Sequence, residues 1–235
     1  MEFSGVDSLN NHYNDINQVY QLVDPVSWYA LDKAVWDNME SSNSGMVDGY
    51  VKLIPIDESN SHVFLRGALI KLNCGIDDCL DLGGGVGRVT KDVLSRYFKR
   101  IDVADQCVSH VNKAKEMKGV VPSFNDAFVC NMQHLVLTKQ YDCIWIQWSI
   151  LYLRDEDLVN MLQVCKAHLK EGGIIVVKEN IGTTEFYWDR KDNSLMRTIT
   201  HMNHLFVKAG LGLLQTRKDL NYPTNFFPLY AFILQ

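Results

Sequence analysis

The sequence Cys79-Leu80-Asp81-Leu82-Gly83-Gly84-Gly85-Val86-Gly87-Arg88-Val89-Thr90-Lys91 decides the fold. It predicts a strand that runs into a turn of glycines and then into a helix. In an open α/β sheet, ligands bind at the carboxyl ends of strands, and Gly83, Gly85 and Gly87 let the backbone approach a ligand closely. The segment therefore predicts a cofactor site, although a plain strand-to-helix turn would give the same pattern.

From about residue 78 onward, short β-rich runs alternate with helical patterns, which is typical of a mostly parallel sheet. The runs cover residues 78–82, 99–104, 123–130, 141–148, 173–178, 211–217 and 227–234, with crossover helices over 89–97, 108–114 and 158–169. The last two runs are too close for a crossover helix, so we expect them to pair antiparallel. The prediction is a doubly wound α/β sheet of seven strands with an antiparallel last strand.

The sequence predicts two parts: a main domain over residues 73–235, and an N-terminal helical extension over residues 1–72 that acts as a substrate lid. Asp24-Pro25 is a good helix start, with an N-cap residue followed by proline at the first helical position. Residues 41–45 form a polar break that predicts a loop. The expected buried face of the helix consists of Trp28, Leu31, Val35 and Met39.

The composition is that of a globular protein, with 235 residues, 47% apolar residues and a formal net charge of −5. This length favours one domain with an appendage, and we expect a monomer. No long Lys/Arg block is present, which argues against nucleic-acid binding. No run approaches the roughly 18 apolar residues of a membrane span, and the first residues lack a signal-peptide pattern, so a cytoplasmic or nuclear protein is expected.

Six cysteines are scattered along the chain without a C-x-x-C pair, and four of them lie in apolar runs. This pattern favours reduced thiols in the core over a metal site, and no metal is expected.

Two nucleotide motifs do not fit the glycine turn. The P-loop pattern is absent, and the dinucleotide fingerprint would need a glycine at Arg88. The spacing of Asp81 before G-x-G-x-G instead resembles motif I of class I S-adenosylmethionine-dependent methyltransferases. Asp105, about 20 residues after the glycines, is then placed to accept both ribose hydroxyls, and it can also cap the next helix. Asp102 faces the other side of its strand by the period of two.

Polar side chains also end the later strands. The turn Asn131-Met132-Gln133 is placed beside the adenine, and Gln147-Trp148 ends a buried run, where a ligand contact or simple packing of Trp148 is possible. Lys178-Glu179-Asn180 ends the next strand. We expect a long loop over residues 181–194, where acids could bind a substrate or simply face solvent.

Together these segments resemble the protein alpha-N-terminal methyltransferase family, which methylates the α-amine of proteins whose N-terminus reads X-Pro-Lys. The resemblance covers about residues 35–235. It rests on Trp36, Gly45-Met46-Val47-Asp48-Gly49-Tyr50, the glycine turn, Trp145-Ile146-Gln147-Trp148, Lys178-Glu179-Asn180 and Tyr230-Ala231-Phe232.

The resemblance implies roles for individual residues. The implied contacts of the cofactor S-adenosylmethionine are Gly83, Gly85, Arg88, Asp105, Met132, Gln133 and Gln147. The implied substrate-binding residues are Trp36, Tyr50, Trp148, Asp189 and Ser194, and the implied catalytic group is Asp192, Asn180 and Tyr152. In this family Arg88 would pair with the cofactor carboxylate, Trp148 would pack on the proline, and Asp192 would be the base. The implied partner is a basic protein N-terminus.

One departure affects the chemistry: the family has a histidine where this chain has Tyr152, and a phenol with a pKa near 10 is a poor base at pH 7. The family's glycine before the Gly49-Tyr50 pair is also replaced, by Asp48. Two alternatives therefore stay open. One is a small-amine methyltransferase with Trp36, Tyr50 and Trp148 as an aromatic cage. The other is a catalytically silent module that binds the cofactor or basic N-termini.

Overall fold

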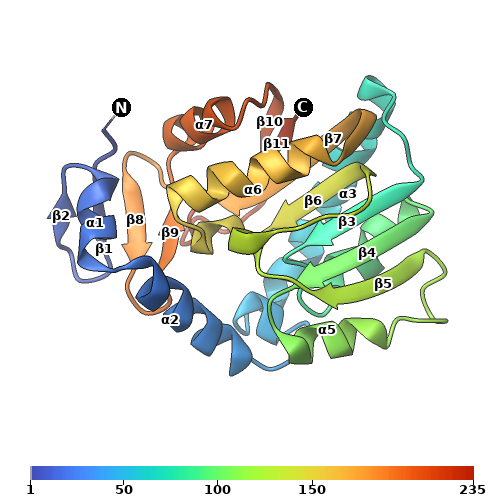
Figure 1. Ribbon diagram of the computed structural model, residues 1–235, viewed down its shortest axis with the longest axis horizontal. Helices are drawn as coiled ribbons and strands as arrows, with labels where there is room; N and C mark the ends of the chain where they lie inside the picture. The colour runs from blue at the N-terminus through green and yellow to red at the C-terminus, as the bar shows by residue number, and fades with distance from the viewer. Residues whose placement is uncertain (1) are drawn as a thin grey trace.

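The computed structural model describes residues 2–235 and centres on a seven-stranded sheet (Figure 1). From edge to edge its strands are β10 (Leu213–Lys218), β11 (Leu229–Leu234), β7 (Leu169–Asn180), β6 (Tyr141–Gln147), β3 (Asp78–Leu82), β4 (Arg100–Asp105) and β5 (Phe124–Val129). β11 is antiparallel to β7 and β10, and all other neighbours are parallel. The predicted doubly wound sheet is confirmed.

The chain builds outward from β3 to β4 and β5, then crosses back to β6 and β7 on the other side. The topological switch point therefore lies between β3 and β6, and the carboxyl ends of these strands open a crevice where a ligand can bind. The glycine turn follows β3 and Trp148 follows β6, so the decisive motifs meet there.

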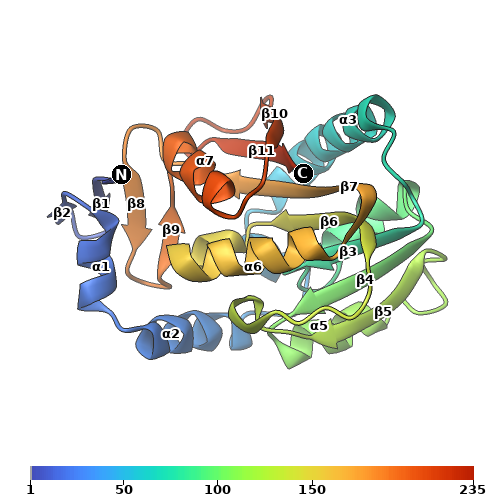
Figure 2. The ribbon, with the colours of Figure 1, turned by 45° about the horizontal axis from the view of Figure 1, so that its top comes forward.

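Helices cover both faces of the sheet (Figure 2). The face packed by Phe64, Val89 and Val111 is covered by α3 (Ile54–Leu72), α4 (Arg88–Asp92) and α5 (Val108–Lys115). The opposite face is covered by α6 (Asp155–Ala167) and α7 (Ile199–Lys208). Short 3-10 turns complete the chain: η1 (Gly45–Val47), η2 (Val51–Leu53), η3 (Leu94–Arg96), η4 (Met132–His134) and η5 (Ile150–Tyr152).

The predicted helix over residues 89–97 is wrong in extent, because α4 ends at Asp92 and η3 follows after a break at Val93. Of its predicted apolar side chains, Val89, Val93 and Leu94 are buried and Tyr97 is partly buried. Their spacing reports which face is buried and not whether the hydrogen-bond ladder is continuous.

A second sheet of four strands stands beside the first, formed by β2 (His12–Tyr13), β1 (Gly5–Asp7), β8 (Phe186–Asp189) and β9 (Ser194–Met196) in that order. The predicted loop over 181–194 is therefore wrong, and so is the reading of residues 1–72 as helix and loop alone. These strands are two to four residues long, and β8 pairs in parallel with β1 from the other end of the chain (Figure 1). Local sequence carries no signal for such a distant pairing.

Two helices join this small sheet to the large one, α1 (Ile16–Leu22) and α2 (Pro25–Asp37). The start of α2 is as predicted, since the Asp24 side chain accepts hydrogen bonds from the backbone N–H groups of Val26 and Ser27. The predicted buried face is wrong at Leu31, which is 36% exposed, whereas Trp28 and Asp32 are buried.

All six cysteines are free thiols, and five of them are buried, in agreement with the prediction. Across residues 2–235 we find no helix with the length and apolar character that a membrane crossing requires.

Candidate functional site

The glycine turn after β3 is held by two carboxylates. Asp81 accepts hydrogen bonds from the backbone N–H and the hydroxyl of Thr90, at 3.1 and 2.7 Å, and so ties the turn to α4. Asp105 accepts one from the backbone N–H of Gly85, at 2.9 Å. Gly85 has a φ of +56°, a conformation that favours glycine. Gly87 does not line the cavity, in contrast to the expectation, and instead caps α4.

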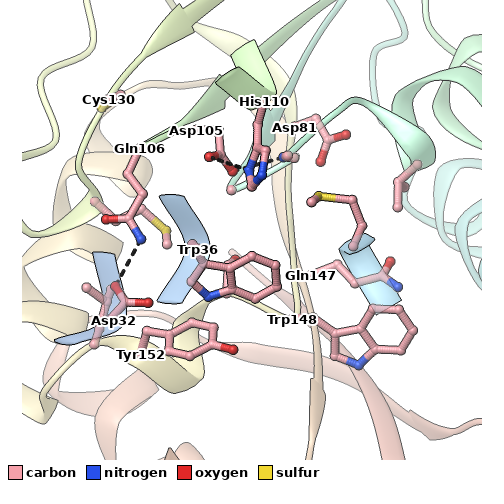
Figure 3. A pocket seen from close by; sticks show the side chains of 18 of the residues that line it. Asp32, Trp36, Asp81, Asp105, Gln106, His110, Cys130, Gln147, Trp148 and Tyr152 are labelled. Atoms are coloured by element: carbon pink, nitrogen blue, oxygen red, sulfur yellow. Dashed lines mark hydrogen bonds and ion pairs between the residues drawn. The ribbon is translucent and has the colours of Figure 1, made fainter. Parts of the chain in front are cut away.

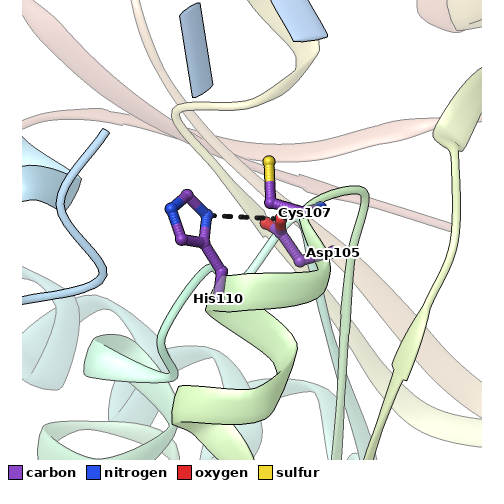
Figure 4. Close-up of side chains that lie close together, drawn as sticks. All are labelled: Asp105, Cys107 and His110. Atoms are coloured by element: carbon purple, nitrogen blue, oxygen red, sulfur yellow. Dashed lines mark hydrogen bonds and ion pairs between the residues drawn. The ribbon is translucent and has the colours of Figure 1, made fainter. Parts of the chain in front are cut away.

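Asp105 is fixed in place at the end of β4. Its other oxygen accepts from the backbone N–H of Cys107, and His110 Nδ1 lies 3.6 Å away (Figure 4). The side chains of Asp105, Cys107 and His110 each offer one potential metal-ligand atom, and these atoms lie within 4.8 Å of one another. Burial raises the pKa of the Cys107 thiol. The arrangement orients the Asp105 carboxylate, while Asp102 points away and binds Lys139, as predicted.

A pocket lies over the switch point, at the carboxyl ends of β3, β4 and β6 (Figure 3). Every residue predicted to contact the cofactor lines this pocket: Gly83, Gly85, Arg88, Asp105, Met132, Gln133 and Gln147. They come from four separate segments of the chain, so the fold brings the predicted set together.

Arg88 and Gln147 are held by a residue that sequence analysis missed. Asp57 of α3 is fully buried, and it pairs with Arg88 Nη2 at 2.8 Å and with Lys178 Nζ at 2.5 Å. Its Oδ1 also accepts a hydrogen bond from Gln147 Nε2 at 2.8 Å. Burial opposes ionisation of Asp57, but Lys178 and Arg88 outweigh it and lower its pKa.

Trp148 occupies a strained position directly after β6. Its φ is +51°, which is uncommon for a large residue and is found at functional sites. The backbone N–H of Trp148 donates to the carbonyl of Lys178 at 3.0 Å, and the Arg88 guanidinium lies 5.5 Å from its ring. The strain turns the indole from the sheet interior toward the pocket (Figure 3).

A second groove adjoins the pocket and shares a wall with it, since Trp36, Met46, Trp148 and Tyr152 line both. All but one of the predicted substrate and catalytic residues line this groove: Trp36, Tyr50, Trp148, Tyr152, Asn180, Asp189 and Asp192. Ser194 does not; it is buried at the start of β9, where its backbone N–H donates to Asp192 at 2.9 Å.

Asp192 and Tyr152 form the acid–phenol pair of the groove. The Tyr152 hydroxyl lies 3.5 Å from Asp192 Oδ2, and the Tyr152 ring packs edge-on against Trp36. Burial raises the pKa of Asp192 and moves that of Tyr152 well above its usual range. Tyr152 therefore stays protonated at neutral pH and can donate a hydrogen bond to Asp192, so of these two groups Asp192 is the candidate proton acceptor.

The pocket carries several buried polar atoms that have no hydrogen-bond partner within residues 2–235: Asp32 Oδ1, Arg88 Nη1, His110 Nε2, Trp148 Nε1 and Ser149 Oγ. Unpaired buried polar atoms are costly, and their concentration here indicates a polar ligand. Asp32, Gln106 and Met46 also line the pocket, and sequence analysis missed them. For Asp32 a signal was present, because it lies one helical turn from both Trp28 and Trp36.

Comparisons with known proteins identify the family of this chain. Residues 24–235 match the family model described as AdoMet dependent proline di-methyltransferase. The chain is 32% identical to "Alpha N-terminal protein methyltransferase 1" of Dictyostelium discoideum, over 99% of this chain and 91% of that protein. It is also 32% identical to "N-terminal Xaa-Pro-Lys N-methyltransferase 1" of Homo sapiens, over 91% of this chain and 98% of that protein.

A solved structure is also similar, a SAM-dependent methyltransferase of Leishmania major with a TM-score of 0.92 and 27% identity. The similarity covers 100% of this chain and 97% of that one. With its glycine turn at the switch point, this chain is an S-adenosylmethionine-dependent methyltransferase and belongs to the AdoMet dependent proline di-methyltransferase family.

Proposed function

We propose that this methyltransferase transfers methyl groups from S-adenosylmethionine to the α-amine of protein N-termini of X-Pro-Lys type. The observation that carries the proposal is the shared wall of pocket and groove, formed by Trp36, Met46, Trp148 and Tyr152. A peptide end in the groove would reach the cofactor pocket over this wall. Curated relatives are named for the same X-Pro-Lys substrate.

The residues of the pocket fit the cofactor. Asp105 presents a fixed carboxylate for ribose hydroxyls. Arg88 Nη1 has no hydrogen-bond partner in the described chain and only a 4.0 Å ion pair with Glu58, so it is available for the cofactor carboxylate. Near Gly83 and Gly85 an added Cβ would collide with Ser149 and Met46, so only glycine leaves this cradle open. When bound, S-adenosylmethionine supplies an electrophilic methyl group on its sulfonium.

The groove fits a basic N-terminus. A proline ring can pack on the indole of Trp148, and Asp189 offers a carboxylate for the ammonium of a lysine. Tyr50 is 52% exposed and packs edge-on against Phe226, which gives the groove an aromatic rim. Asn180 donates its amide to the carbonyl of Phe227 at 2.7 Å, so its oxygen remains for the backbone of the peptide end.

The chemistry needs only weak base catalysis. An α-amine has a pKa of about 7.7 to 8.0, so part of it is already neutral and nucleophilic at neutral pH. In our proposal the groove excludes water and orients the amine, and Asp192 accepts its proton. The Tyr152 hydroxyl donates to Asp192 Oδ2 at 3.5 Å, and the backbone N–H of Ser194 donates to Asp192 Oδ1. These two contacts orient the Asp192 carboxylate.

We also propose that residues 1–72 act as an extension and substrate lid on the domain of residues 73–235. In support, α2 lines both the pocket and the groove. We further propose a monomer that acts in the cytoplasm or nucleus and binds neither nucleic acid nor membranes, since the net charge of −5 suits basic peptides.

The test uses purified protein, S-adenosylmethionine and two peptides that begin Ser-Pro-Lys, one with a free α-amine and one N-acetylated, read by mass. We expect methyl additions on the free peptide only. Asp192→Asn should abolish turnover while binding of S-adenosylhomocysteine persists. Asp189→Asn should raise KM for Ser-Pro-Lys but not for Ser-Pro-Gln. Cofactor binding without methylation of the free peptide would overturn the proposal and favour a small amine or a silent module.

A further inference from the structure

The lid helix α2 carries a buried acid that the activity above does not use. Asp32 is only 4% exposed, and it lines the cofactor pocket one helical turn from Trp36. Its Oδ1 has no hydrogen-bond partner in the described chain, residues 2–235. A buried carboxyl oxygen without a partner costs free energy unless a ligand supplies one.

The carboxyl group of Asp32 is held by Gln106, which follows the end of β4. Gln106 Nε2 donates to Asp32 Oδ2 at 2.9 Å, which leaves Oδ1 as the free oxygen (Figure 3). Lys33, the next residue of α2, forms its ion pair with Asp37 at 2.5 Å on the exposed side and not with Asp32. The contact between Asp32 and Gln106 joins α2 to the residue that follows β4 on one side of the pocket.

The position of Asp32 indicates which part of the cofactor it meets. Gln106 directly follows Asp105, the acid placed for the ribose hydroxyls, and Cys130 lies on the same side of the pocket. Figure 3 shows Asp32 and Gln106 on one side and Gln147 and Trp148 on the other. Arg88, which is placed for the cofactor carboxylate, packs against Trp148 on that other side. Asp32 therefore lies at the nucleoside end.

We propose that Asp32 is a cofactor-binding residue, whose free carboxyl oxygen accepts a hydrogen bond from the adenosine moiety of S-adenosylmethionine. The adenosine carries two kinds of donor, the 6-amino group of adenine and the ribose hydroxyls. This inference concerns the cofactor alone and does not depend on which amine is methylated. It would also give α2 a direct contact with the cofactor.

The ionisation of Asp32 fits this role. Its pKa is raised to about 7, mainly by burial and also by the charges of Asp192 and Asp105, against the hydrogen bond from Gln106 and the charge of Lys33. A ligand donor would favour the ionised form. Binding should therefore be measured above that pKa, at about pH 8, where the carboxylate is already charged.

The experiment compares binding of S-adenosylhomocysteine to the wild-type protein, Asp32→Asn and Asp37→Asn by calorimetry. In Asp32→Asn the side-chain oxygen keeps the bond from Gln106, so the amide NH₂ faces the pocket and presents a donor to a donor. We expect Kd to rise about tenfold, the value of one charge-assisted hydrogen bond. Asp37→Asn makes the same change on the exposed side of α2 and should bind like wild type.

Three further ligands identify the donor: S-inosylhomocysteine, which has an oxo group in place of the 6-amino group, and the 2′-deoxy and 3′-deoxy forms of S-adenosylhomocysteine. Because Asp105 is placed for the ribose hydroxyls, wild type should lose affinity for both deoxy forms whatever Asp32 binds. The analogue that lacks the donor to Asp32 is the one for which Asp32→Asn loses clearly less affinity than wild type does. Melting temperatures without ligand should be alike for wild type and Asp32→Asn. The proposal would be overturned if Asp32→Asn bound S-adenosylhomocysteine as tightly as wild type does. It would also be overturned if each analogue lost the same affinity for wild type and for Asp32→Asn.

Discussion

At the scale of single residues, Asp57 decides how the cofactor pocket is prepared. One carboxylate on α3 holds both Arg88 and Gln147, and it does so from a position that is fully buried. Arg88 and Gln147, which we propose contact the cofactor, are thus fixed before it binds, and this reduces the entropy lost on binding. Asp57 is a positioning residue, because it acts through Arg88 and Gln147.

Asp57→Asn tests this role. Asp57 accepts from Arg88, Lys178 and Gln147, and the single amide oxygen of asparagine cannot accept from all three. Arg88 and Gln147 then lose their fixed positions, so we expect Kd for S-adenosylhomocysteine to rise about tenfold or more. Stability should fall by about 3 kcal/mol, as when a buried pair is broken. Asp219→Asn is the matched control, since Asp219 also pairs with Lys178, at 2.8 Å, but not with Arg88. Equal Kd values for the two variants would refute the positioning role.

Glu179 makes stability depend on pH. It is 2% exposed, and burial raises its pKa to about 8 against hydrogen bonds from nearby backbone N–H groups, including that of Asn180. Between about pH 4.5 and pH 8 the folded state keeps a proton that the unfolded state has released, so stability falls as pH rises.

Glu179→Gln replaces the ionisable carboxyl group with an amide of nearly the same size and shape. The variant should gain stability relative to wild type as pH rises through that window, by at most about 1.4 kcal/mol per pH unit, and the difference should level off above it. Guanidinium unfolding at a series of pH values measures both curves. A difference that does not change with pH would show that Glu179 is ionised in the folded protein.

At the scale of elements, the β8–β9 hairpin places the acids of the groove. Asp189 ends β8, Asp192 lies in the turn, and Ser194 begins β9. The hairpin is anchored by β1, where Gly5 pairs with Phe186. A Cβ on Gly5 would lie 2.3 Å from the Phe186 ring, so this pairing needs glycine.

Gly5→Ala should therefore displace the hairpin and raise KM for the peptide severalfold, while Kd for S-adenosylhomocysteine stays the same. Steady-state kinetics and calorimetry separate the two effects. Gly67→Ala is the control, because Gly67 lies on the exposed side of α3 with no atom near its missing Cβ and should gain about 0.5–1 kcal/mol of stability. An unchanged peptide KM in Gly5→Ala would count against the anchoring role of β1.

The same elements show what the sequence could and could not reveal. The strands of the large sheet were predictable because each is a buried apolar run followed by turn residues. The small sheet was not, because its strands are two to four residues long and pair across the whole chain. Asp32 was missed because apolar spacing selected Leu31, and Asp57 because its partners come from distant strands.

At the scale of the whole molecule, the two binding sites are parts of one surface. The cofactor pocket and the groove share four side chains, which come from α2, η1, the end of β6 and η5. The cofactor and the peptide would therefore each have to order the same side chains on binding. Binding of one ligand should then lower the ordering cost of the other, and the coupling must be reciprocal.

We therefore expect S-adenosylhomocysteine to tighten binding of a Ser-Pro-Lys peptide about fivefold or more, and the peptide to tighten binding of S-adenosylhomocysteine by the same factor. Calorimetry of each ligand with and without the other measures both. Trp148→Leu removes part of the shared wall and should reduce the factor by which one ligand tightens binding of the other. Tyr50→Ala changes only the groove, so it should weaken peptide binding and leave that factor unchanged. Equal peptide affinity with and without S-adenosylhomocysteine would mean that the shared wall is already rigid in the free protein.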